Sequence, residues 1–383
     1  MARIICISKY PPLEGGIAAK TFWLCRALAE RGHTVHVVTD GENIDSDYCS
    51  SAFQDQLSAN DLFNLHVHRP KEKVPWHIPN DPHRSLALLN VALEVIDRHG
   101  ADAIDTGYLI PYGLVGCLAG KMTGLPFLIR HGGSDLNKFL DKGIWANLIT
   151  KTIKGANAVI TDSEHYEGFC GLSKRVISIP PYVPDPAFFK PAPVEKSKPT
   201  LALIGKANYY WRHKGWHRAI EIIKSLGDRV HYMIVSQGIG LKDFRKYVED
   251  RIDFVIEWKE FVHPVEVPLM LQSVSGVFVL QNDLPFPVFS NLVMEALYCN
   301  VTVITDRPDM IQNLKKKGLN VDAESRHVLI VPNDQPDKAA KAISDYFEKP
   351  VPRQIDIKQK ETEYAAYIHK NEEMILSVIK KVG

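Results

Sequence analysis

Short apolar runs alternate with segments of helical periodicity along the chain. In the first half, the apolar runs predict strands at residues 3–8, 35–39, 62–68, 103–106, 127–130, 158–161 and 176–179. Apolar residues spaced three and four apart predict helices at residues 17–31, 84–99, 110–123 and 138–155. Such alternation of strand and helix is typical of an α/β domain built on a parallel sheet.

The same alternation restarts near residue 200. Predicted strands lie at residues 201–204, 230–235, 253–256, 276–280, 301–304 and 328–331. Predicted helices lie at residues 216–225, 264–272, 336–347 and 364–380, and another begins near Ser290. A chain of 383 residues exceeds one hydrophobic core, so the repeated plan predicts two domains.

A proline-rich stretch separates the two halves. Seven prolines lie from Pro180 to Pro199, where they prevent a continuous helix or sheet. This composition is typical of a linker between domains. We expect a first domain at residues 1–184, the linker at 185–199, a second domain at 200–355 and a terminal helix at 356–383.

Composition narrows the class of protein. With 45% apolar residues, 24% charged residues and a net charge of +1, the chain is typical of a globular protein and shows no overall charge that would attract nucleic acid. No run reaches the ~20 apolar residues that span a bilayer, and we expect no signal peptide. The six cysteines form no Cys-x-x-Cys pair, so neither a zinc framework nor a disulfide framework is expected. We expect a cytoplasmic protein.

The segment at residues 285–297 (PFPVFSNLVMEAL) carries the first chemical signal. Ser290 and Asn291 are good N-cap residues, and the helix they begin carries Glu295. The backbone N–H groups at a helix N-terminus favour a phosphate, and a carboxylate accepts hydrogen bonds from sugar hydroxyls. Together they suggest a ligand with a diphosphate and a ribose. Glu295 on its own could equally complement the helix dipole.

Glycines and a histidine follow strands in the first half. Gly15 and Gly16 lie in a loop between strand and helix, where backbone can approach a ligand, although such a pair also occurs in simple tight turns. No third glycine completes a dinucleotide fingerprint. His131 follows the strand at 127–130, where it could bind a sugar hydroxyl or developing charge. The alternative is a capping turn in which Ser134 or Asp135 begins the next helix.

Lysines mark the corresponding loop of the second half. Lys206 ends one predicted strand and Lys214 begins the next helix, so the two could hold a diphosphate between them. The alternative is that both are solvated surface lysines.

Two further patterns favour structural interpretations. His66 and His68 share one side of a strand, which is more typical of surface histidines than of a metal site. The helix at 138–155 combines Lys138, Lys142, Lys151 and Lys154 with apolar residues. It could lie on a membrane surface, but a core helix with a solvated lysine face is preferred.

Several of these segments together resemble a known family. Residues 10–18 (YPPLEGGIA) and 28–39 (LAERGHTVHVVT) resemble the amino-terminal signature of the family 4 retaining glycosyltransferases of GT-B fold. Gly205-Lys206, Lys214-Gly215 and residues 289–297 (FSNLVMEAL) resemble the donor-site motifs of the same family. The similarity runs through essentially the whole chain in order, and the combination is more specific than any single motif.

The resemblance implies an α/β GT-B architecture of two facing Rossmann-like domains with parallel sheets and an interdomain cleft. It implies a nucleotide diphosphate sugar, uridine-linked, held mainly by the second domain, and an acceptor held mainly by the first. The terminal helix would cross back onto the first domain. Neither a cofactor nor a metal would be needed, and we expect no nucleic-acid partner.

The resemblance also implies roles for individual residues. Gly15 and Gly16 would approach the donor phosphate or the acceptor, and His131 would lie beside the transferred sugar. Lys206 and Lys214 would bind the diphosphate and stabilise the leaving group. The remaining donor-site positions are Phe289, Ser290, Asn291 and Glu295, the last of which would hold the ribose.

One position departs from the family pattern. Pro287 stands where the family has the first of two glutamates, and Asp283 is the nearest upstream carboxylate. A degenerate protein that binds nucleotide without transfer, or a nucleotide-sugar epimerase, therefore remains an alternative to a transferase. The acceptor is left open among a lipid-linked sugar, a small molecule and a glycan, with peripheral membrane contact as one possibility.

Overall fold

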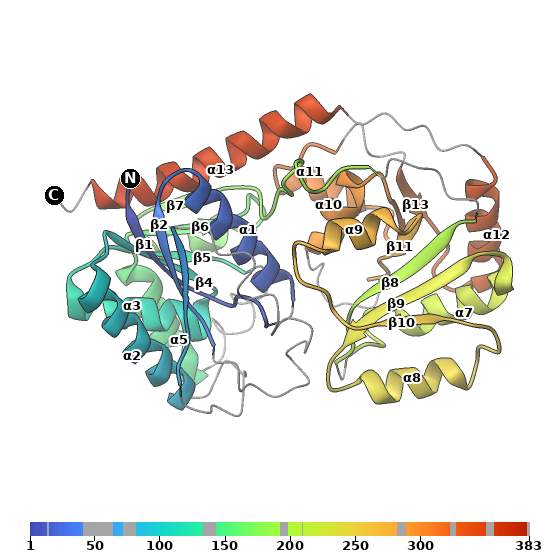
Figure 1. Cartoon of the computed structure of the whole chain (residues 1–383), viewed down its shortest axis with the longest axis horizontal. Coiled ribbons are helices and arrows are strands. Elements are labelled where there is room, and N and C mark those ends of the chain that lie inside the picture. Colours follow the sequence, from blue (N-terminus) through green and yellow to red (C-terminus); the bar gives the residue numbers. More distant parts are fainter. Residues whose placement is uncertain are drawn as a thin grey trace. The chain divides into compact units, whose positions relative to one another are not determined.

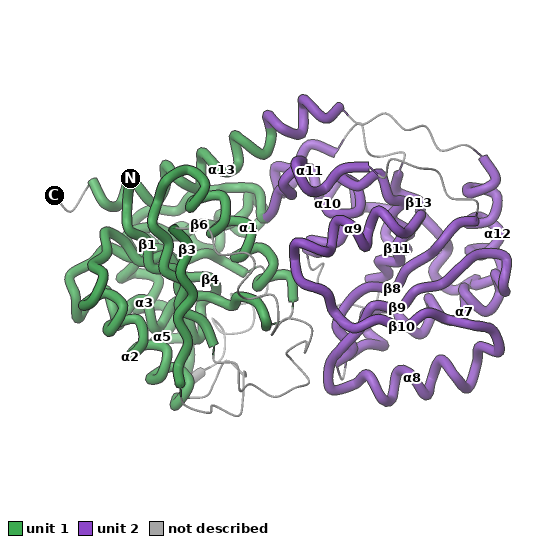
Figure 2. The backbone as a smooth tube through the Cα atoms, viewed as in Figure 1, with its two compact units in different colours: residues 1–181, 363–383 green, residues 182–362 purple. Residues whose placement is uncertain are grey.

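The structure is a computed structural model of the whole chain (Figure 1). It describes residues 1–13, 15–40, 64–71, 82–132, 143–191, 198–208, 210–281, 289–321, 327–349 and 356–380. The chain divides into two compact units, coloured separately in Figure 2. Unit 1 comprises Met1–Pro181 together with Glu363–Gly383, and unit 2 comprises Tyr182–Thr362.

Unit 1 contains a parallel sheet with strand order β3-β2-β1-β4-β5-β6-β7. Its strands are β1 (Arg3–Ile7), β2 (Thr34–Val38), β3 (Leu65–His68), β4 (Ala103–Gly107), β5 (Phe127–Arg130), β6 (Ala158–Thr161) and β7 (Val176–Ser178). Ile4 of the central strand pairs with Val35 on one side and Ala103 on the other. The order reverses between β1 and β4, which is where open α/β sheets bind their ligands.

Helices cover both faces of this sheet. They are α1 (Gly16–Glu30), α2 (Pro82–His99), the π-helical turn η3 (Leu109–Gly113), α3 (Leu114–Thr123), α5 (Gly143–Gly155) and α6 (Tyr166–Phe169). Ile5 and Ile7 point into a core formed with α2, α3 and α5. Side chains alternate along a strand, so Cys6 points to the other face, where it contacts Cys25 of α1.

The described part of the lysine-rich segment is a core helix. Ile149 and Ile153 of α5 are fully buried in the core of unit 1, whereas Lys151 and Lys154 are exposed. Lys138 and Lys142 lie outside the described residues. Across the part of the chain that the structure describes, no helix is long and apolar enough to cross a membrane.

Unit 2 repeats the plan of unit 1 with strand order β10-β9-β8-β11-β12-β13, all parallel. Its strands are β8 (Thr200–Lys206), β9 (His231–Gln237), β10 (Glu257–Lys259), β11 (Gly276–Phe278), β12 (Thr302–Thr305) and β13 (Val328–Ile330). Here the strand order reverses between β8 and β11. The second unit therefore has its own reversal of strand order, the position at which open α/β sheets commonly bind ligands.

The helices of unit 2 pack on this sheet around an aromatic core. They are α7 (Trp216–Leu226), the 3₁₀ turn η4 (Gly227–Arg229), α8 (Leu241–Glu249), α9 (Val267–Gln272), α10 (Asn291–Tyr298), α11 (Met310–Lys316) and α12 (Pro336–Phe347). The ring of Phe244 lies 5.0 Å from that of Trp211 and 4.8 Å from that of Trp216. These contacts anchor the segment between β8 and α7 to the core.

Some predicted elements differ from the structure. The strand predicted at residues 253–256 is wrong, because β10 begins only at Glu257. Phe254 instead packs against Tyr232, with ring centroids 5.4 Å apart, and Ile256 also packs against the core from this segment, whereas Val255 is exposed. The helix predicted from residue 110 begins as the turn η3, where Ile110 is non-helical beside Pro111. Helices α8 and α11 were not predicted.

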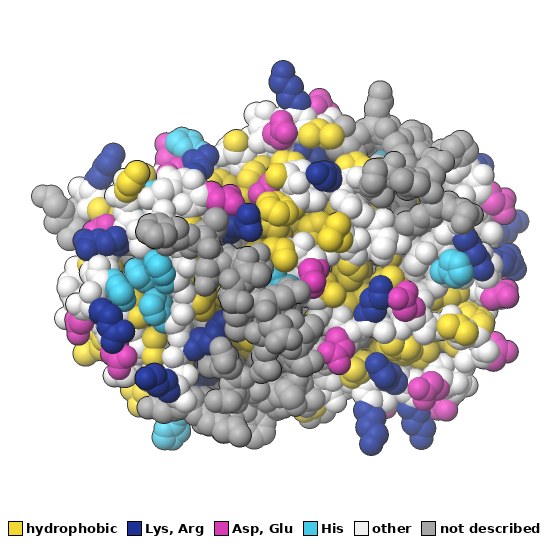
Figure 3. All heavy atoms as spheres, viewed as in Figure 1, with side chains coloured by type: hydrophobic (Ala, Val, Ile, Leu, Met, Phe, Trp, Pro, Cys, Tyr) yellow, Lys and Arg dark blue, Asp and Glu magenta, His cyan; other side chains and the backbone are white. Residues whose placement is uncertain are grey.

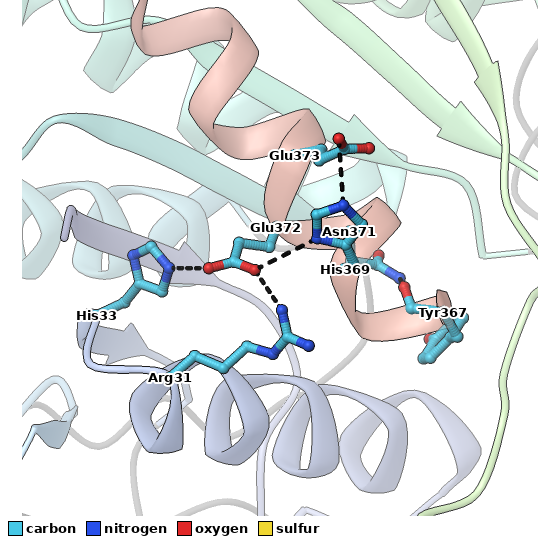
Figure 4. Close-up of polar contacts among 7 residues, drawn as sticks. All are labelled: Arg31, His33, Tyr367, His369, Asn371, Glu372 and Glu373. Atoms are coloured by element: carbon cyan, nitrogen blue, oxygen red, sulfur yellow. Dashed lines mark hydrogen bonds and ion pairs between the residues drawn. The ribbon is translucent and has the colours of Figure 1, made fainter. Parts of the chain in front are cut away.

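The final helix, α13 (Ile357–Ile379), is tied to unit 1 by polar contacts along its second half (Figure 4). Glu372 accepts a hydrogen bond from Arg31 at 2.5 Å and lies 2.8 Å from Nε2 of His33. Arg175 donates to Ser377 at 2.8 Å. The helix begins seven residues earlier than the predicted start at residue 364.

Candidate functional site

Lys206 and Lys214 lie together at the point where the strand order of unit 2 reverses. Lys206 is the last residue of β8. The ammonium of Lys214 donates a hydrogen bond to the backbone oxygen of Lys206 at 2.8 Å. The same ammonium lies 5.6 Å from the ring centroid of the buried Trp216. Two positive side chains thus lie at the carboxyl edge of the sheet, where an anionic ligand would bind.

Gly215 fixes the path of the chain after Lys214. Its φ of +70° is in the left-handed region, which favours glycine. A Cβ at this position would lie 2.7 Å from Cβ of Leu280 and 3.0 Å from its backbone oxygen. The loop before α7 therefore packs directly on the end of β11, and a larger residue would push Lys214 away from Lys206.

A buried ion pair holds the same edge together. Arg218, one turn into α7, pairs with Asp306, which follows β12. The other carboxylate oxygen of Asp306 accepts a hydrogen bond from the backbone N–H of Gln281 at 3.0 Å, just after β11. The pair was missed from the sequence, because nothing local marks an arginine and an aspartate 88 positions apart as partners.

Glu295 is buried in the second turn of α10, with 7% of its surface exposed. Burial raises the pKa of its carboxyl to about 7, and a hydrogen bond with the Tyr182 hydroxyl opposes that rise. A carboxyl with this pKa changes charge near neutral pH, so its capacity to accept hydrogen bonds is sensitive to pH.

The start of α10 differs in one respect from the expectation. Ser290 occupies the cap position, but its side chain makes no capping hydrogen bond, and Asn291 is already the first helical residue. The backbone N–H of Val293, which a capping side chain would bind, donates instead to the backbone oxygen of Ser290 at 3.1 Å. The hydroxyl of Ser290 therefore takes no part in the helix hydrogen bonds. Phe289 and Ser290 are half-buried directly before the helix. Pro287 and Asp283 lie outside the described residues.

In unit 1, His131 lies at the carboxyl edge of the sheet and is held by the next strand. Its backbone N–H donates to Ile160 at 2.8 Å, and its Nδ1 lies 3.1 Å from the hydroxyl of Thr161. Its ring centroid is 5.1 Å from that of Phe169. The side chain is buried, and these contacts fix the imidazole beside the end of β5.

The loop after β5 meets the start of α1 at the reversal point of unit 1. A Cβ at Gly132 would lie 2.2 Å from Cδ2 of Tyr108 and 3.5 Å from Cδ1 of Ile17. Tyr108 follows β4 with a φ of +103°, which is rare for a residue with a side chain. Gly15 caps α1 with a φ of +113°, and Gly16 is the first helical residue. The candidate residues of unit 1 therefore gather around its own reversal point.

One group near His131 has the composition of a cation site. Asp162, Glu164 and His165 offer ligand atoms within 4.8 Å of one another. Nδ1 of His165 already lies 2.7 Å from a carboxylate oxygen of Asp162, and Glu164 is exposed. The expectation that the reaction needs no metal remains a prediction.

Comparisons with known proteins identify the architecture. Residues 15–170 match the family model of the glycosyl transferase 4-like domain. Sucrose-phosphate synthase from Thermosynechococcus elongatus has a similar structure, with a TM-score of 0.65, 15% identity and coverage of 100% of this chain and 98% of that chain. No curated protein sequence matches this chain.

Two further solved structures share the fold. HepE from Anabaena, in complex with UDP and glucose, has a TM-score of 0.62 and 15% identity and covers 100% of this chain and 98% of its own. A glycosyltransferase from Rickettsia africae has a TM-score of 0.62 and 15% identity, with 99% of each chain covered. The resemblance stated from the sequence and the expected GT-B α/β fold are both confirmed.

Proposed function

We propose that this chain, a GT-B protein with a glycosyl transferase 4-like domain at residues 15–170, is a retaining glycosyltransferase that uses a uridine diphosphate sugar. The sugar passes to an acceptor hydroxyl, and the reaction needs no metal. The family match and the fold support a glycosyltransferase of GT-B type, while the donor, the stereochemistry and the metal independence are the proposal.

The observation that carries the proposal is the position of Lys206 and Lys214. Both lie at the carboxyl edge of the sheet of unit 2, beside the reversal of strand order. A diphosphate that leaves a sugar gains negative charge as the bond breaks, and fixed positive charges stabilise that change. Lysine suits this task because its ammonium is a compact point charge.

Glu295 supplies the second contact with the nucleotide. Its carboxyl follows the start of α10 within the same unit, and as a carboxylate it would accept hydrogen bonds from the ribose hydroxyls. The HepE structure contains UDP and glucose, which makes uridine the first base to test. Phe289, Ser290 and Asn291 precede Glu295 and would line the same donor site.

The proposed chemical step combines the mechanism that the family resemblance implies with the charges of Lys206 and Lys214. The acceptor oxygen forms a bond to the anomeric carbon on the face from which the diphosphate departs, so the configuration is retained. The leaving phosphate oxygen takes the proton of the acceptor hydroxyl, and Lys206 and Lys214 stabilise the charge that the phosphate gains. His131 is proposed to orient a hydroxyl of the transferred sugar through its imidazole.

The test is a transfer assay coupled to nucleotide binding. UDP and its sugar conjugates are compared with other nucleoside diphosphates and nicotinamide cofactors by thermal shift, and UDP release is then measured with added acceptors. Lys214→Ala and Lys206→Ala should each lower turnover roughly 10²-fold. Lys242→Ala, an exposed lysine of α8, is the matched control and should keep full activity.

Each alternative has a distinct outcome in this test. A saturable shift with UDP but no transfer to any acceptor would indicate the degenerate binding protein, for which Pro287 is the sequence feature. Interconversion of two UDP-sugars without an acceptor would indicate an epimerase. Full activity of both lysine variants would show that the diphosphate does not bind at Lys206 and Lys214.

A further inference from the structure

Four histidines from three elements of unit 1 gather at the edge of its sheet, away from the residues of the proposed transfer. His36 lies in β2, His66 and His68 lie in the edge strand β3, and His99 ends α2. Histidine side chains lie together on the face shown in Figure 3, where they are cyan. The glycosyl transfer proposed above assigns them no role.

His36 is the centre of this group. Its ring is stacked on that of His66 at 5.0 Å and on that of His99 at 4.8 Å, measured between centroids. His68 lies 5.2 Å from His36 and 6.0 Å from His99. Four imidazoles therefore share one small region of the surface, although they come from residues that span more than sixty positions of the sequence.

The shortest contact has the spacing of two metal ligands. Nδ1 of His36 lies 3.0 Å from Nε2 of His68. Two nitrogens bound to one tetrahedral zinc ion at 2.0–2.1 Å are separated by about 3.3 Å. A small outward movement of one ring would thus let an ion replace the proton that joins the two nitrogens.

Packing holds one of these two rings in place. His36 has only 3% of its surface exposed, so its ring is held in place by packing.

We propose that His36, His66, His68 and His99 form a transition-metal site whose first two ligands are His36 and His68. Imidazole nitrogens suit zinc, copper and nickel, and zinc is the ion proposed here. In the present arrangement only the pair His36–His68 has ligand spacing. The exposed side chains of His66 and His99 can rotate to supply a third ligand, with water as the fourth.

Such an ion would add a side-chain link between β2 and β3, which already pair in the sheet, and would join both strands to the end of α2. It would fasten the edge strand β3 to β2 through His36 and to the end of α2 through His99. Edge strands expose unpaired backbone groups and are the part of a sheet most prone to open or to pair with another chain. The role assigned to the ion is therefore structural, and the rate of glycosyl transfer should not depend on it.

Zinc titration of the full-length chain, freed of metal by dialysis against a chelator, tests the site. Calorimetry should show one saturable site, and the melting temperature should rise with the logarithm of the free zinc concentration once that concentration exceeds the dissociation constant. His68→Gln and His99→Gln should each weaken zinc binding by about tenfold or more. His231→Gln, at an exposed histidine in unit 2, is the matched control and should bind zinc as the wild type does.

Three results would overturn the inference. The first is no saturable binding by the wild type. The second is binding that His68→Gln leaves unchanged, which would place the ion elsewhere, for example at Asp162, Glu164 and His165. The third is a cobalt-loaded protein without the visible absorption of a tetrahedral nitrogen site. Circular dichroism of each variant shows whether it is folded, so a loss of zinc binding can be separated from a loss of structure.

Discussion

Arg130 donates a hydrogen bond from its guanidinium to the side-chain oxygen of Asn371 at 2.5 Å, across 241 positions of the sequence. The same guanidinium pairs with the buried Asp105 at 2.8 Å. Asn371 in turn donates to the backbone oxygen of Tyr367 one turn earlier in α13. Helix α13 thereby fixes the residue that immediately precedes His131.

Replacing Asn371 should affect both stability and turnover. Asn371→Ala leaves a buried charged donor with one partner fewer, which costs about 1.5–3 kcal/mol of unfolding free energy. His131 would also be held less firmly, so turnover should fall while nucleotide affinity, which the proposed function assigns to unit 2, stays unchanged. Chemical denaturation and steady-state kinetics measure the two effects.

The same helix offers the control for that experiment. Glu373 is 62% exposed and pairs with His369 at 3.3 Å on the surface. Glu373→Ala should change stability by less than about 1 kcal/mol. If Asn371→Ala and Glu373→Ala lower the unfolding free energy by the same amount, the hydrogen bond from Arg130 to Asn371 does not stabilise the fold as predicted.

Glu295 should make stability depend on pH. Its folded pKa of about 7 exceeds the ordinary value of 4.5, so between these values the unfolded chain has lost a proton that the folded chain still holds. Stability contributed by the protonated carboxyl is therefore complete below pH 4.5 and is lost as the pH rises to 7, by roughly 3 kcal/mol in total. Glu295→Gln, which cannot ionise, should lack this loss when unfolding is compared at pH 5 and pH 8.

The same carboxyl should make nucleotide binding depend on pH. The ionised form offers two charged acceptor oxygens to the ribose hydroxyls, whereas protonation turns one of those oxygens into a donor, so UDP affinity should rise through pH 7 in the wild type. At pH 8, Glu295→Gln should bind UDP more weakly than the wild type does. Its UDP affinity should also lack the increase that ionisation of Glu295 causes. Parallel pH profiles for the two proteins would remove Glu295 from the nucleotide site.

Two glycine substitutions separate backbone strain from local packing. Gly215→Ala introduces a left-handed alanine and places its Cβ 2.7 Å from Leu280. Gly227→Ala places alanine at a φ of +65° and a ψ of −154°, a region that essentially only glycine occupies, but no atom lies within 4 Å of its Cβ. Gly227→Ala should therefore cost about 1–3 kcal/mol through backbone strain alone. Gly215→Ala combines left-handed strain with the close contact at Leu280, and it should destabilise unit 2 through both.

Only Gly215→Ala should also weaken UDP binding, since only that change displaces Lys214. Calorimetric titration of both variants measures the difference. A loss of affinity that is the same in both would mean that general destabilisation of unit 2 is responsible, and it would contradict the position proposed for the diphosphate.

Chelation should leave glycosyl transfer intact. The proposed chemistry assigns the stabilisation of the leaving group to Lys206 and Lys214, so treatment with a chelator should not change the initial rate. The prediction fails if the rate falls and added magnesium or manganese restores it. The zinc site at His36 and His68 predicts a lower melting temperature under the same treatment, which is a separate measurement.

Elements with a regular local pattern could be predicted from the sequence. The helix α12 has the predicted bounds of residues 336–347, and β5 and β6 match the predicted strands. Helix α8 was missed although Leu241, Phe244, Tyr247 and Val248 lie at helical spacing and pack in the core of unit 2, so its short apolar face was present in the sequence. Residues 253–256 suggested a strand because Phe254 and Ile256, which pack against the core from a loop, alternate as the buried side chains of a strand do.

The site could be predicted only where its members adjoin a motif. Lys206 and Lys214 lie eight positions apart, and each stands beside a glycine that resembles the family pattern. Arg218 and Asp306 meet through the fold, and their separate segments carry no sign of that contact. The histidine group was seen from the sequence as His66 and His68 alone, because the other two come from different elements.

The discontinuity of unit 1 has a consequence for how the protein is made. Residues 363–380 are translated after all of unit 2, yet they supply the partner of Arg130 and the acceptor for Arg31. A nascent chain that has emerged only as far as residue 181 therefore carries Arg31 and Arg130 without the partners that α13 supplies. Unit 1 is therefore the first unit to begin synthesis and the last to be completed. Unit 2 is synthesised, and can fold, before unit 1 has received its C-terminal helix.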